Sequence, residues 1–400
     1  MNEDVLDDAE ALQAGDPRAV LRSLAGAGAQ VRHAMALTTE SLPPGWEDAG
    51  RLRAVLVAAR GGASVVAGAL AAVVGGAGPV PVLALSGARL PAWVGAMDLV
   101  VAISLSGRAE GAVAVAAEAG RRGANLLTVG GGDSPLEQVS ERFRGAHVQL
   151  PEPERQSTSA PTSRTALWSL LTPPLLACDR LGLLPAAAAG CSADLAAVAD
   201  ALDAEAEACR PSSEAFVNPA KLLALDLNGT VPVILGDSAL GAVAARRAAS
   251  VLARTARIPA VHGALPDDAG DVVATFGGPF ASDACDEVFA DPFLDGPAAT
   301  RLRLMLIDVG DGIGFGAVRT LAERSGVRVS SVQAHVESAE PDDPLDAPSA
   351  GPGRGFAESP LQHFARVVAR VDFAATYLAL ACGLDPAVSP HVAELRDSLR

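Results

Sequence analysis

The chain has 400 residues and a formal net charge of −16, and half of its residues are hydrophobic although only 4% are aromatic. This apolar fraction excludes wholesale disorder. An acidic chain with few aromatic residues has neither the excess of cations nor the stacking platforms that nucleic-acid binding requires. We therefore expect a folded protein without a nucleic-acid partner.

Three features of the sequence bear on where the protein works. Its five cysteines are odd in number and far apart, which fits neither a disulfide framework nor a zinc site. The acidic start, residues 1–10, has no basic region and does not resemble a signal peptide. Apolar stretches over 54–85 and 166–189 contain charged residues and prolines, so neither fits a membrane span. We expect a soluble, cytoplasmic protein with no membrane contact, no metal site and no cofactor.

The first half of the chain alternates short apolar runs with glycine breaks and helical patterns. After two helical stretches over 5–14 and 18–37, the pattern predicts strands over 54–58, 81–85, 98–104 and 124–129, with helices ending at 74 and covering 110–121. Continuous apolar runs are typical of strands buried on both faces, and strand–helix alternation is typical of a parallel α/β sheet.

The α/β pattern returns after two predicted helices over 164–184 and 192–209. Its elements are strands over 230–235, 271–276 and 301–308, helices ending near 255 and 324, and final helices over 361–381 and from 390. The fold class is therefore α/β, with two parallel-sheet units, flanking helices and a C-terminal helical tail. The expected organisation is a helical segment over 1–50, a first unit over 51–155, connecting helices over 156–210, a second unit over 211–335, an acidic loop over 336–358 and the tail over 359–400.

Three predicted strands of the first unit end in loops rich in Gly and Ser. These loops are Gly61-Gly62-Ala63-Ser64, Ser104-Leu105-Ser106-Gly107-Arg108 and residues 130–134. The unpaired N–H groups and positive dipole end of a following helix favour an anion. Each loop alone also fits ordinary turn chemistry, but three at one sheet edge favour a ligand there. The first loop lacks the G-x-G-x-x-G pattern, which argues against a dinucleotide.

Motifs at both ends of residues 50–400 are similar to those of a known family. They are Gly61-Gly62-Ala63-Ser64 with Gly68, Leu90-Pro91-Ala92-Trp93-Val94, Ser104-Leu105-Ser106-Gly107, Ser359-Pro360-Leu361, Asp372-Phe373, Tyr377-Leu378-Ala379-Leu380, Gly383-Leu384-Asp385-Pro386 and Glu394-Leu395-Arg396. This set resembles the sugar isomerase (SIS) domain family, in particular its bifunctional phosphoglucose/phosphomannose isomerase branch, including divergent actinobacterial members of the TobH type. The resemblance implies two SIS domains, a homodimer, a role in carbohydrate metabolism, and a 6-phosphosugar bound between domains.

The resemblance also implies which residues hold the ligand. The phosphate would be bound by Ser104, Ser106, Gly107 and Arg108, with Gly62 and Ser64 lining the sugar side. Arg108 stands where the family has an asparagine and would add a charge-assisted contact. Arg164 aligns with the family's arginine that faces the developing enediolate, which implies that it stabilises this charge. A surface arginine at a helix start is the other interpretation of Arg164.

The catalytic positions of the second unit depart from the family pattern. Val272 stands where the family has its base glutamate, Gly270 replaces its histidine, and Arg396 replaces a lysine that can release its proton. Aldose–ketose isomerisation needs a base that moves a proton between C1 and C2. Asp271 is the nearest substitute, one methylene shorter and one residue displaced. We expect weak isomerase activity at most, with Arg164 and Asp271 as candidate catalytic residues.

Three functions therefore remain open. The first is aldose–ketose isomerisation of a 6-phosphohexose with weak catalysis. The second is a non-catalytic sugar-phosphate sensor or regulator of hexose-phosphate metabolism. The third is a purely structural partner of another enzyme. Turnover separates the first function from the second, and ligand binding separates the second from the third.

Overall fold

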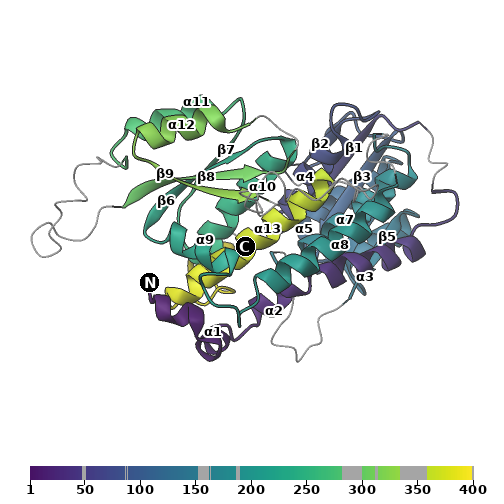
Figure 1. Cartoon of the computed structure of the whole chain (residues 1–400). Coiled ribbons are helices and arrows are strands. Elements are labelled where there is room, and N and C mark those ends of the chain that lie inside the picture. The colour runs from purple at the N-terminus through teal and green to yellow at the C-terminus, as the bar shows by residue number, and fades with distance from the viewer. Residues whose placement is uncertain are drawn as a thin grey trace, which may run out of the picture.

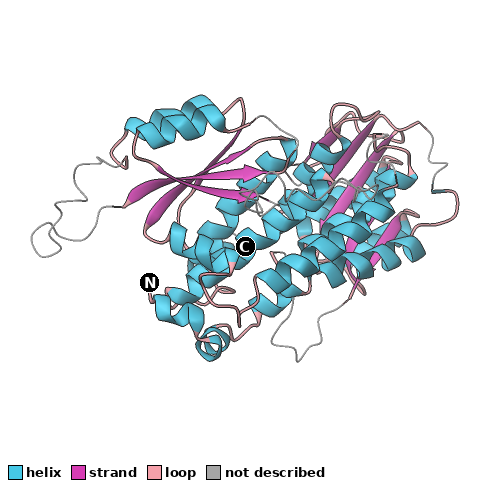
Figure 2. Cartoon of the chain, in the orientation of Figure 1, coloured by secondary structure: helices cyan, strands magenta, loops and turns pink. Residues whose placement is uncertain are grey.

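The computed structural model describes residues 1–46, 51–85, 87, 89–151, 162, 164–185, 190–281, 300–310, 314–333 and 358–398. Two α/β units lie on either side of the long tail helix α13 (Pro360–Ala381), as Figure 1 shows. Figure 2 shows that both units contain a twisted sheet with helices against it. The predicted α/β class with two parallel sheets and flanking helices is confirmed.

The first sheet has five parallel strands in the order β2-β1-β3-β4-β5. The strands are β1 (Ala54–Ala58), β2 (Val82–Ala84), β3 (Asp98–Ser104), β4 (Asn125–Gly131) and β5 (Ala146–Leu150). Every residue of β1 and β3 is buried, because their continuous apolar runs face helices on both sides of the sheet. The helices of this unit are α4 (Ser64–Val74), α5 (Glu110–Arg121) and α6 (Pro135–Arg142).

The second sheet has four parallel strands in the order β7-β6-β8-β9. They are β6 (Thr230–Gly236), β7 (Val261–Ala264), β8 (Arg301–Asp308) and β9 (Arg328–Gln333), and the helices of this unit are α10 (Ala239–Val251), α11 (Ala269–Ala274) and α12 (Gly316–Arg324). α10 continues into the π-helical turn η5 (Leu252–Ala256).

The strand predicted over 271–276 is wrong, because these residues form α11 and the short turn η6 (Thr275–Gly277). Val272 and Phe276 are buried, whereas Asp271 and Ala274 are exposed. A spacing of four between the buried residues puts both on one helical face, which packs against the sheet. The β-branched pair Val272-Val273 suggested a strand, and the tertiary position of this segment overrode that local preference.

The remaining described helices enclose the two sheets. They are η1 (Glu3–Asp7), α1 (Ala9–Gly15), α2 (Val20–Ala25), α3 (Ala27–Ser41), α7 (Leu167–Arg180), α8 (Cys191–Ala208), α9 (Pro219–Leu227) and α14 (Pro390–Ser398). α13 begins with a capping box in which Ser359 and Gln362 satisfy each other's backbone N–H groups. Each described helix is too short or too polar to cross a lipid bilayer.

Two sets of contacts fix the arrangement of the fold: those between the two units, and those between the N-terminal segment and the C-terminal tail. α4 of the first unit packs against α10 of the second, where a Cβ on Gly68 would lie 3.1 Å from Val243 Cγ2. The N-terminal segment is tied to the tail, since the Asn2 N–H donates to the Ala381 carbonyl at 2.8 Å and Arg18 pairs with Asp385 at 2.9 Å. The N-terminal helices are therefore part of the same core as the two units.

Candidate functional site

The strand order of the first sheet reverses direction at β1. From β1 the chain continues to β2 on one side and then crosses to β3 on the other. In open parallel sheets, ligands bind outside the carboxyl ends of the two strands at such a reversal. The loops after β1 and β3 are 61–64 and 104–108, so the fold brings the predicted sugar-side residues, Gly62 and Ser64, beside the predicted phosphate loop.

The Ser104–Arg108 loop (the phosphate loop below) is a tight turn around Gly107. The Gly107 N–H donates to the Ser104 carbonyl at 2.8 Å, and Gly107 has a φ of +66°, a conformation that favours glycine. Ser104 is buried, and its Oγ accepts a hydrogen bond from the Ala109 N–H at 3.2 Å. Ser106 and Arg108 are exposed. Ser104 therefore holds the turn, while the Ser106 hydroxyl and the Arg108 guanidinium remain accessible to a ligand.

The loop after β4 supports the phosphate loop from behind. The Gly131 N–H donates to the Leu105 carbonyl at 3.0 Å, and the Leu136 N–H donates to the Gly107 carbonyl at 3.1 Å. The Arg108 guanidinium donates to the Asp133 carbonyl at 3.0 Å. These bonds fix the phosphate loop before any ligand arrives.

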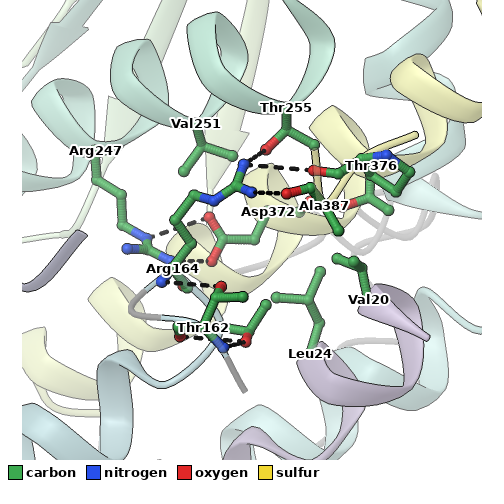
Figure 3. Close-up of a pocket in the computed structure, with 12 residues that line it drawn as sticks. Val20, Leu24, Thr162, Arg164, Arg247, Val251, Thr255, Asp372, Thr376 and Ala387 are labelled. Atoms are coloured by element: carbon green, nitrogen blue, oxygen red, sulfur yellow. Dashed lines mark hydrogen bonds and ion pairs between the residues drawn. The ribbon is translucent and has the colours of Figure 1, made fainter. Parts of the chain in front are cut away.

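Arg164 lies between the second unit and the tail (Figure 3). Its guanidinium donates to Thr255 Oγ1 at 3.1 Å and to the Ala387 carbonyl at 2.7 Å. The cavity beside it has a volume of about 30 Å³, which is the volume of one water molecule and too small for a sugar. Arg164 therefore joins segments of the fold, and the cavities that it lines among the described residues are too small for a sugar.

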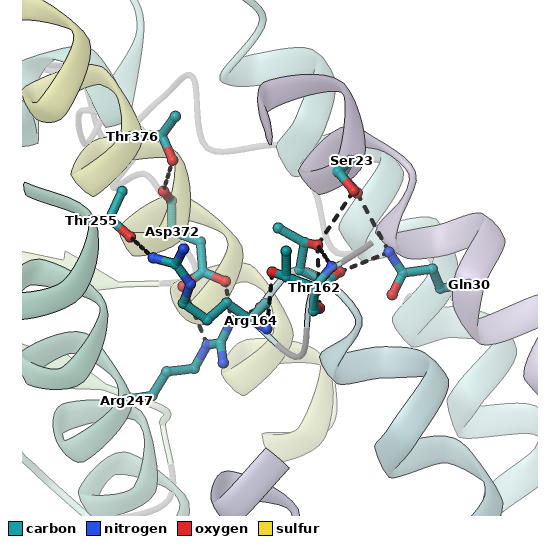
Figure 4. Close-up of polar contacts among 9 residues, drawn as sticks. Ser23, Gln30, Thr162, Arg164, Arg247, Thr255, Asp372 and Thr376 are labelled. Atoms are coloured by element: carbon teal, nitrogen blue, oxygen red, sulfur yellow. Dashed lines mark hydrogen bonds and ion pairs between the residues drawn. The ribbon is translucent and has the colours of Figure 1, made fainter. Parts of the chain in front are cut away.

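A buried ion pair lies next to Arg164. Arg247 and Asp372 contact each other through both carboxylate oxygens, and their side chains are 4% and 9% exposed. Arg247 also donates to the Arg164 carbonyl at 2.8 Å (Figure 4). Burial raises the pKa of Asp372, and the charge of Arg247 opposes this rise. The pair connects α10, α13 and the start of the α7 segment.

Asp271 and Arg164 of the same chain lie far apart in space. Asp271 is exposed in the first turn of α11, which follows the carboxyl end of β7. Arg164 contacts η5, which ends at the opposite, amino edge of the same sheet. The span of residues 239–256 between these edges is on the order of 25 Å at 1.5 Å per residue. The structure thus does not bring the two candidate catalytic residues together in one chain.

The equivalent strand reversal in the second unit carries acidic residues. Asp237 follows β6 and is buried, and its carboxylate accepts hydrogen bonds from Ser238 Oγ at 3.0 Å and the Val309 N–H at 3.2 Å. Burial raises the pKa of Asp237, and the neighbouring Asp308 carboxyl contributes to this rise. A phosphate would meet carboxyl groups here, so the edge of the first sheet is the better anion site.

Sequence patterns did not identify the partners of the arginines. Asp372, Thr255 and Ala387 come from segments distant in sequence from Arg164 and Arg247. The available signal was a single acidic residue inside the apolar helical pattern of 361–381, a position where an acid needs a buried cation.

The described part of the chain contains the buried cysteines Cys178, Cys191 and Cys209 and the exposed Cys382. Within it, no group of three or more His, Cys, Asp or Glu residues is placed to hold a metal ion. Burial raises the pKa of Cys178 and of Cys191 to about 12, so both thiols stay protonated at neutral pH.

Comparisons with known proteins bear on the fold of the chain and on the family of its second unit. Residues 216–341 match the model of the bacterial phospho-glucose isomerase C-terminal SIS domain. Comparison of the sequence with curated proteins gives no match. A protein from Clostridium difficile 630 assigned as a phosphosugar isomerase is 12% identical, with a TM-score of 0.63 over 93% of this chain and 95% of its own.

Two further solved structures share the fold. One, from Silicibacter pomeroyi DSS-3 and also assigned as a phosphosugar isomerase, is 16% identical with a TM-score of 0.58 over 92% of this chain and 99% of its own. The C-terminal domain of glucosamine-fructose-6-phosphate aminotransferase from Francisella tularensis is 14% identical with a TM-score of 0.55 over 92% and 97%. The second unit, over residues 216–341, is thus similar to the C-terminal SIS domain of bacterial phosphoglucose isomerases, which supports the resemblance seen in the motifs, and the chain as a whole shares the fold of these three solved structures.

Proposed function

We propose that this protein binds a phosphosugar at the carboxyl edge of its first sheet. The observation that carries the proposal is the meeting of the 61–64 loop and the phosphate loop at the strand reversal. Ser106 and Arg108 offer accessible donors there, the loop itself contains no acidic residue, and α5 begins at Glu110, two residues after Arg108. Hydroxyls, a guanidinium and a helix N-terminus together suit a phosphate.

The comparisons support the class of ligand. The matched family is a phosphoglucose isomerase domain, and the names of the similar structures refer to phosphosugar isomerases and to an aminotransferase of fructose 6-phosphate. A cytoplasmic location fits a protein that works on such metabolites.

Calorimetric titration with fructose 6-phosphate tests the site. Ser106→Ala should weaken binding by roughly 1–2 kcal/mol, or about 5- to 30-fold, because one hydrogen bond to a charged group is lost. Ser104→Ala should also weaken binding, by loosening the turn. Ser398→Ala, which changes an exposed serine at the end of α14, is the control and should bind as the wild type does. Wild-type affinity in both loop variants would reject the site.

For the reaction, we propose isomerase turnover that is weak. Arg164 is engaged by Thr255 and Ala387, and Asp271 lies on the order of 25 Å away along the second unit. Loss of a general base removes about 10² to 10⁴ in rate. A coupled assay from fructose 6-phosphate to glucose or mannose 6-phosphate should stay well below about 10 s⁻¹, the median for enzymes. Turnover above that value would contradict this proposal.

The distance between Arg164 and Asp271 also favours a second function, a non-catalytic sensor of phosphosugars. A sensor keeps the phosphate loop intact while the catalytic residues are free to diverge. Binding of fructose 6-phosphate without any turnover would identify a sensor. Low turnover that Asp271→Asn abolishes would identify a weak isomerase instead.

We also propose that the protein is a homodimer. Because Arg164 and Asp271 are far apart in one chain, a site that used both would need a second copy. Light scattering should then give twice the chain mass of 40.3 kDa. A stable monomer at micromolar concentration would contradict the proposal.

A further inference from the structure

A cavity of about 350 Å³ opens beside the phosphate loop, between α3, the start of α7 and the carboxyl ends of β3 and β5. We call it the α3 pocket, and its polar and loop-side lining includes Arg22, Gln30, His33, Leu105 and Ser169. Its volume lies in the range of about 300–1,000 Å³ typical of small-molecule sites. The cavity at Arg164 is about tenfold smaller.

The charge of the α3 pocket is unusual for this chain. Among the described residues, its lining contains an arginine and a histidine but no acidic residue, whereas the chain as a whole carries −16. No carboxylate in the described ranges forms an ion pair with Arg22. A larger cavity between α1, α2 and α8 is lined by three acidic residues, Asp16, Asp203 and Glu207, together with Arg210 and with Arg22, which lines both cavities. The α3 pocket is thus suited to a ligand rich in oxygen atoms that accept hydrogen bonds.

Two polar side chains of the N-terminal segment are already held in place (Figure 4). Gln30 Nε2 donates to the Thr165 carbonyl at 2.9 Å, and Ser23 Oγ donates to Thr165 Oγ1 at 3.4 Å. Ser169 Oγ donates to Gln30 Oε1 at 3.5 Å. Gln30 Nε2 also donates to the Ser23 carbonyl at 3.4 Å, so its Oε1 is the atom with capacity left to accept a hydrogen bond from a ligand hydroxyl. A fixed amide loses little conformational entropy when it binds a ligand, so Gln30 is a preorganised acceptor for a hydroxyl group.

The α3 pocket borders the phosphate loop through one residue, Leu105. Leu105, which lines the pocket, stands between Ser104 and Ser106 in the phosphate loop. A ligand whose phosphate lies on that loop therefore has the pocket next to it. The opposite wall of the pocket comes from α2 and α3, which lie outside the residues whose motifs resemble the family.

We propose that the α3 pocket takes the polyhydroxylated part of a phosphosugar whose phosphate is bound by the phosphate loop. Arg22, Gln30 and His33 are then specificity-determining contacts, and the N-terminal helical segment decides which sugar the protein accepts. This inference rests on the proposed phosphosugar-binding function, and it assigns the sugar contacts to residues of the N-terminal segment.

The test compares fructose 6-phosphate with inorganic phosphate by calorimetric titration. Arg22→Gln and His33→Ala should each weaken fructose 6-phosphate binding by about threefold to tenfold and leave the affinity for inorganic phosphate within twofold of the wild type. Arg121→Gln and His391→Ala change exposed residues of the same types away from the pocket and serve as matched controls. Ser106→Ala should weaken the binding of both ligands.

The outcomes separate the two proposals. If the wild type binds fructose 6-phosphate and both pocket variants bind it equally well, the inference is overturned and the proposed function stands. If the wild type binds neither ligand, the proposed function falls and the inference falls with it. Because Arg22 and His33 are both exposed, equal thermal unfolding midpoints of wild type and variants should show that the fold is intact.

Discussion

The packing of Gly107 predicts a large effect for Gly107→Ala. Its φ of +66° costs a residue with a Cβ roughly 1–2 kcal/mol. The added Cβ would also lie 2.1 Å from Ser134 Oγ and 2.4 Å from Ser134 Cβ, and such overpacking costs about 1–3 kcal/mol. We expect Gly107→Ala to lower the free energy of unfolding by about 2–5 kcal/mol in a urea titration.

Two further variants separate the causes of this loss. Gly61 has a φ of +62° but no atom within 4 Å of an added Cβ, so Gly61→Ala should cost only the backbone strain, about 1 kcal/mol. Ser134 caps α6, and glycine replaces a cap at a cost of a few tenths of a kcal/mol. Gly107→Ala with Ser134→Gly should therefore recover about 1–3 kcal/mol. Equal losses of stability in Gly107→Ala and Gly61→Ala would show that Ser134 does not obstruct a Cβ at position 107.

Two other predictions follow from buried polar groups. Asp372→Asn should lower the free energy of unfolding by about 3–5 kcal/mol, because it leaves Arg247 buried without its counter-charge. Arg18→Gln, which breaks an exposed ion pair, should lower it by less than about 1 kcal/mol. Equal losses of the two variants in urea titrations would contradict this account. Burial lowers the pKa of His147 below its ordinary value of 6.5, so its contribution to stability is present above pH 6.5 and is lost as the pH falls below it. The unfolding midpoint should fall less between pH 7.5 and pH 5 in His147→Gln than in the wild type. The control, His391→Gln, should behave as the wild type does. An identical fall in all three proteins would disprove this contribution.

The inner strands could be predicted from sequence, whereas among the edge strands only β2 was predicted, over 81–85, and β5, β7 and β9 were not. The predicted bounds of β1, β3 and β8 agree with the structure because each is a continuous apolar run. β5 and β9 lie at sheet edges, and their inner and outer residues alternate. A polar edge strand such as β9 carries no apolar run, and its identity is set by pairing with β8.

The candidate site was predictable only as far as local motifs reach. The phosphate loop follows from residues that are adjacent in sequence, since Ser104, Ser106 and Gly107 belong to one turn. The contacts of Arg164 depend on Thr255 and on Ala387, which lie 91 and 223 residues further along the chain. The α3 pocket needs α3, β3 and α7 to meet, and only tertiary packing brings them together.

The central claim is that one sheet edge, in the first unit, binds the phosphate of a phosphosugar. A crystal structure of the protein soaked with glucose 6-phosphate tests this claim most directly. We expect density for the phosphate within hydrogen-bond distance of Ser106 Oγ and the Arg108 guanidinium, with none beside Asp237 in the second unit. Phosphate bound at the edge of the second sheet, with the Ser106 loop empty, would contradict the account.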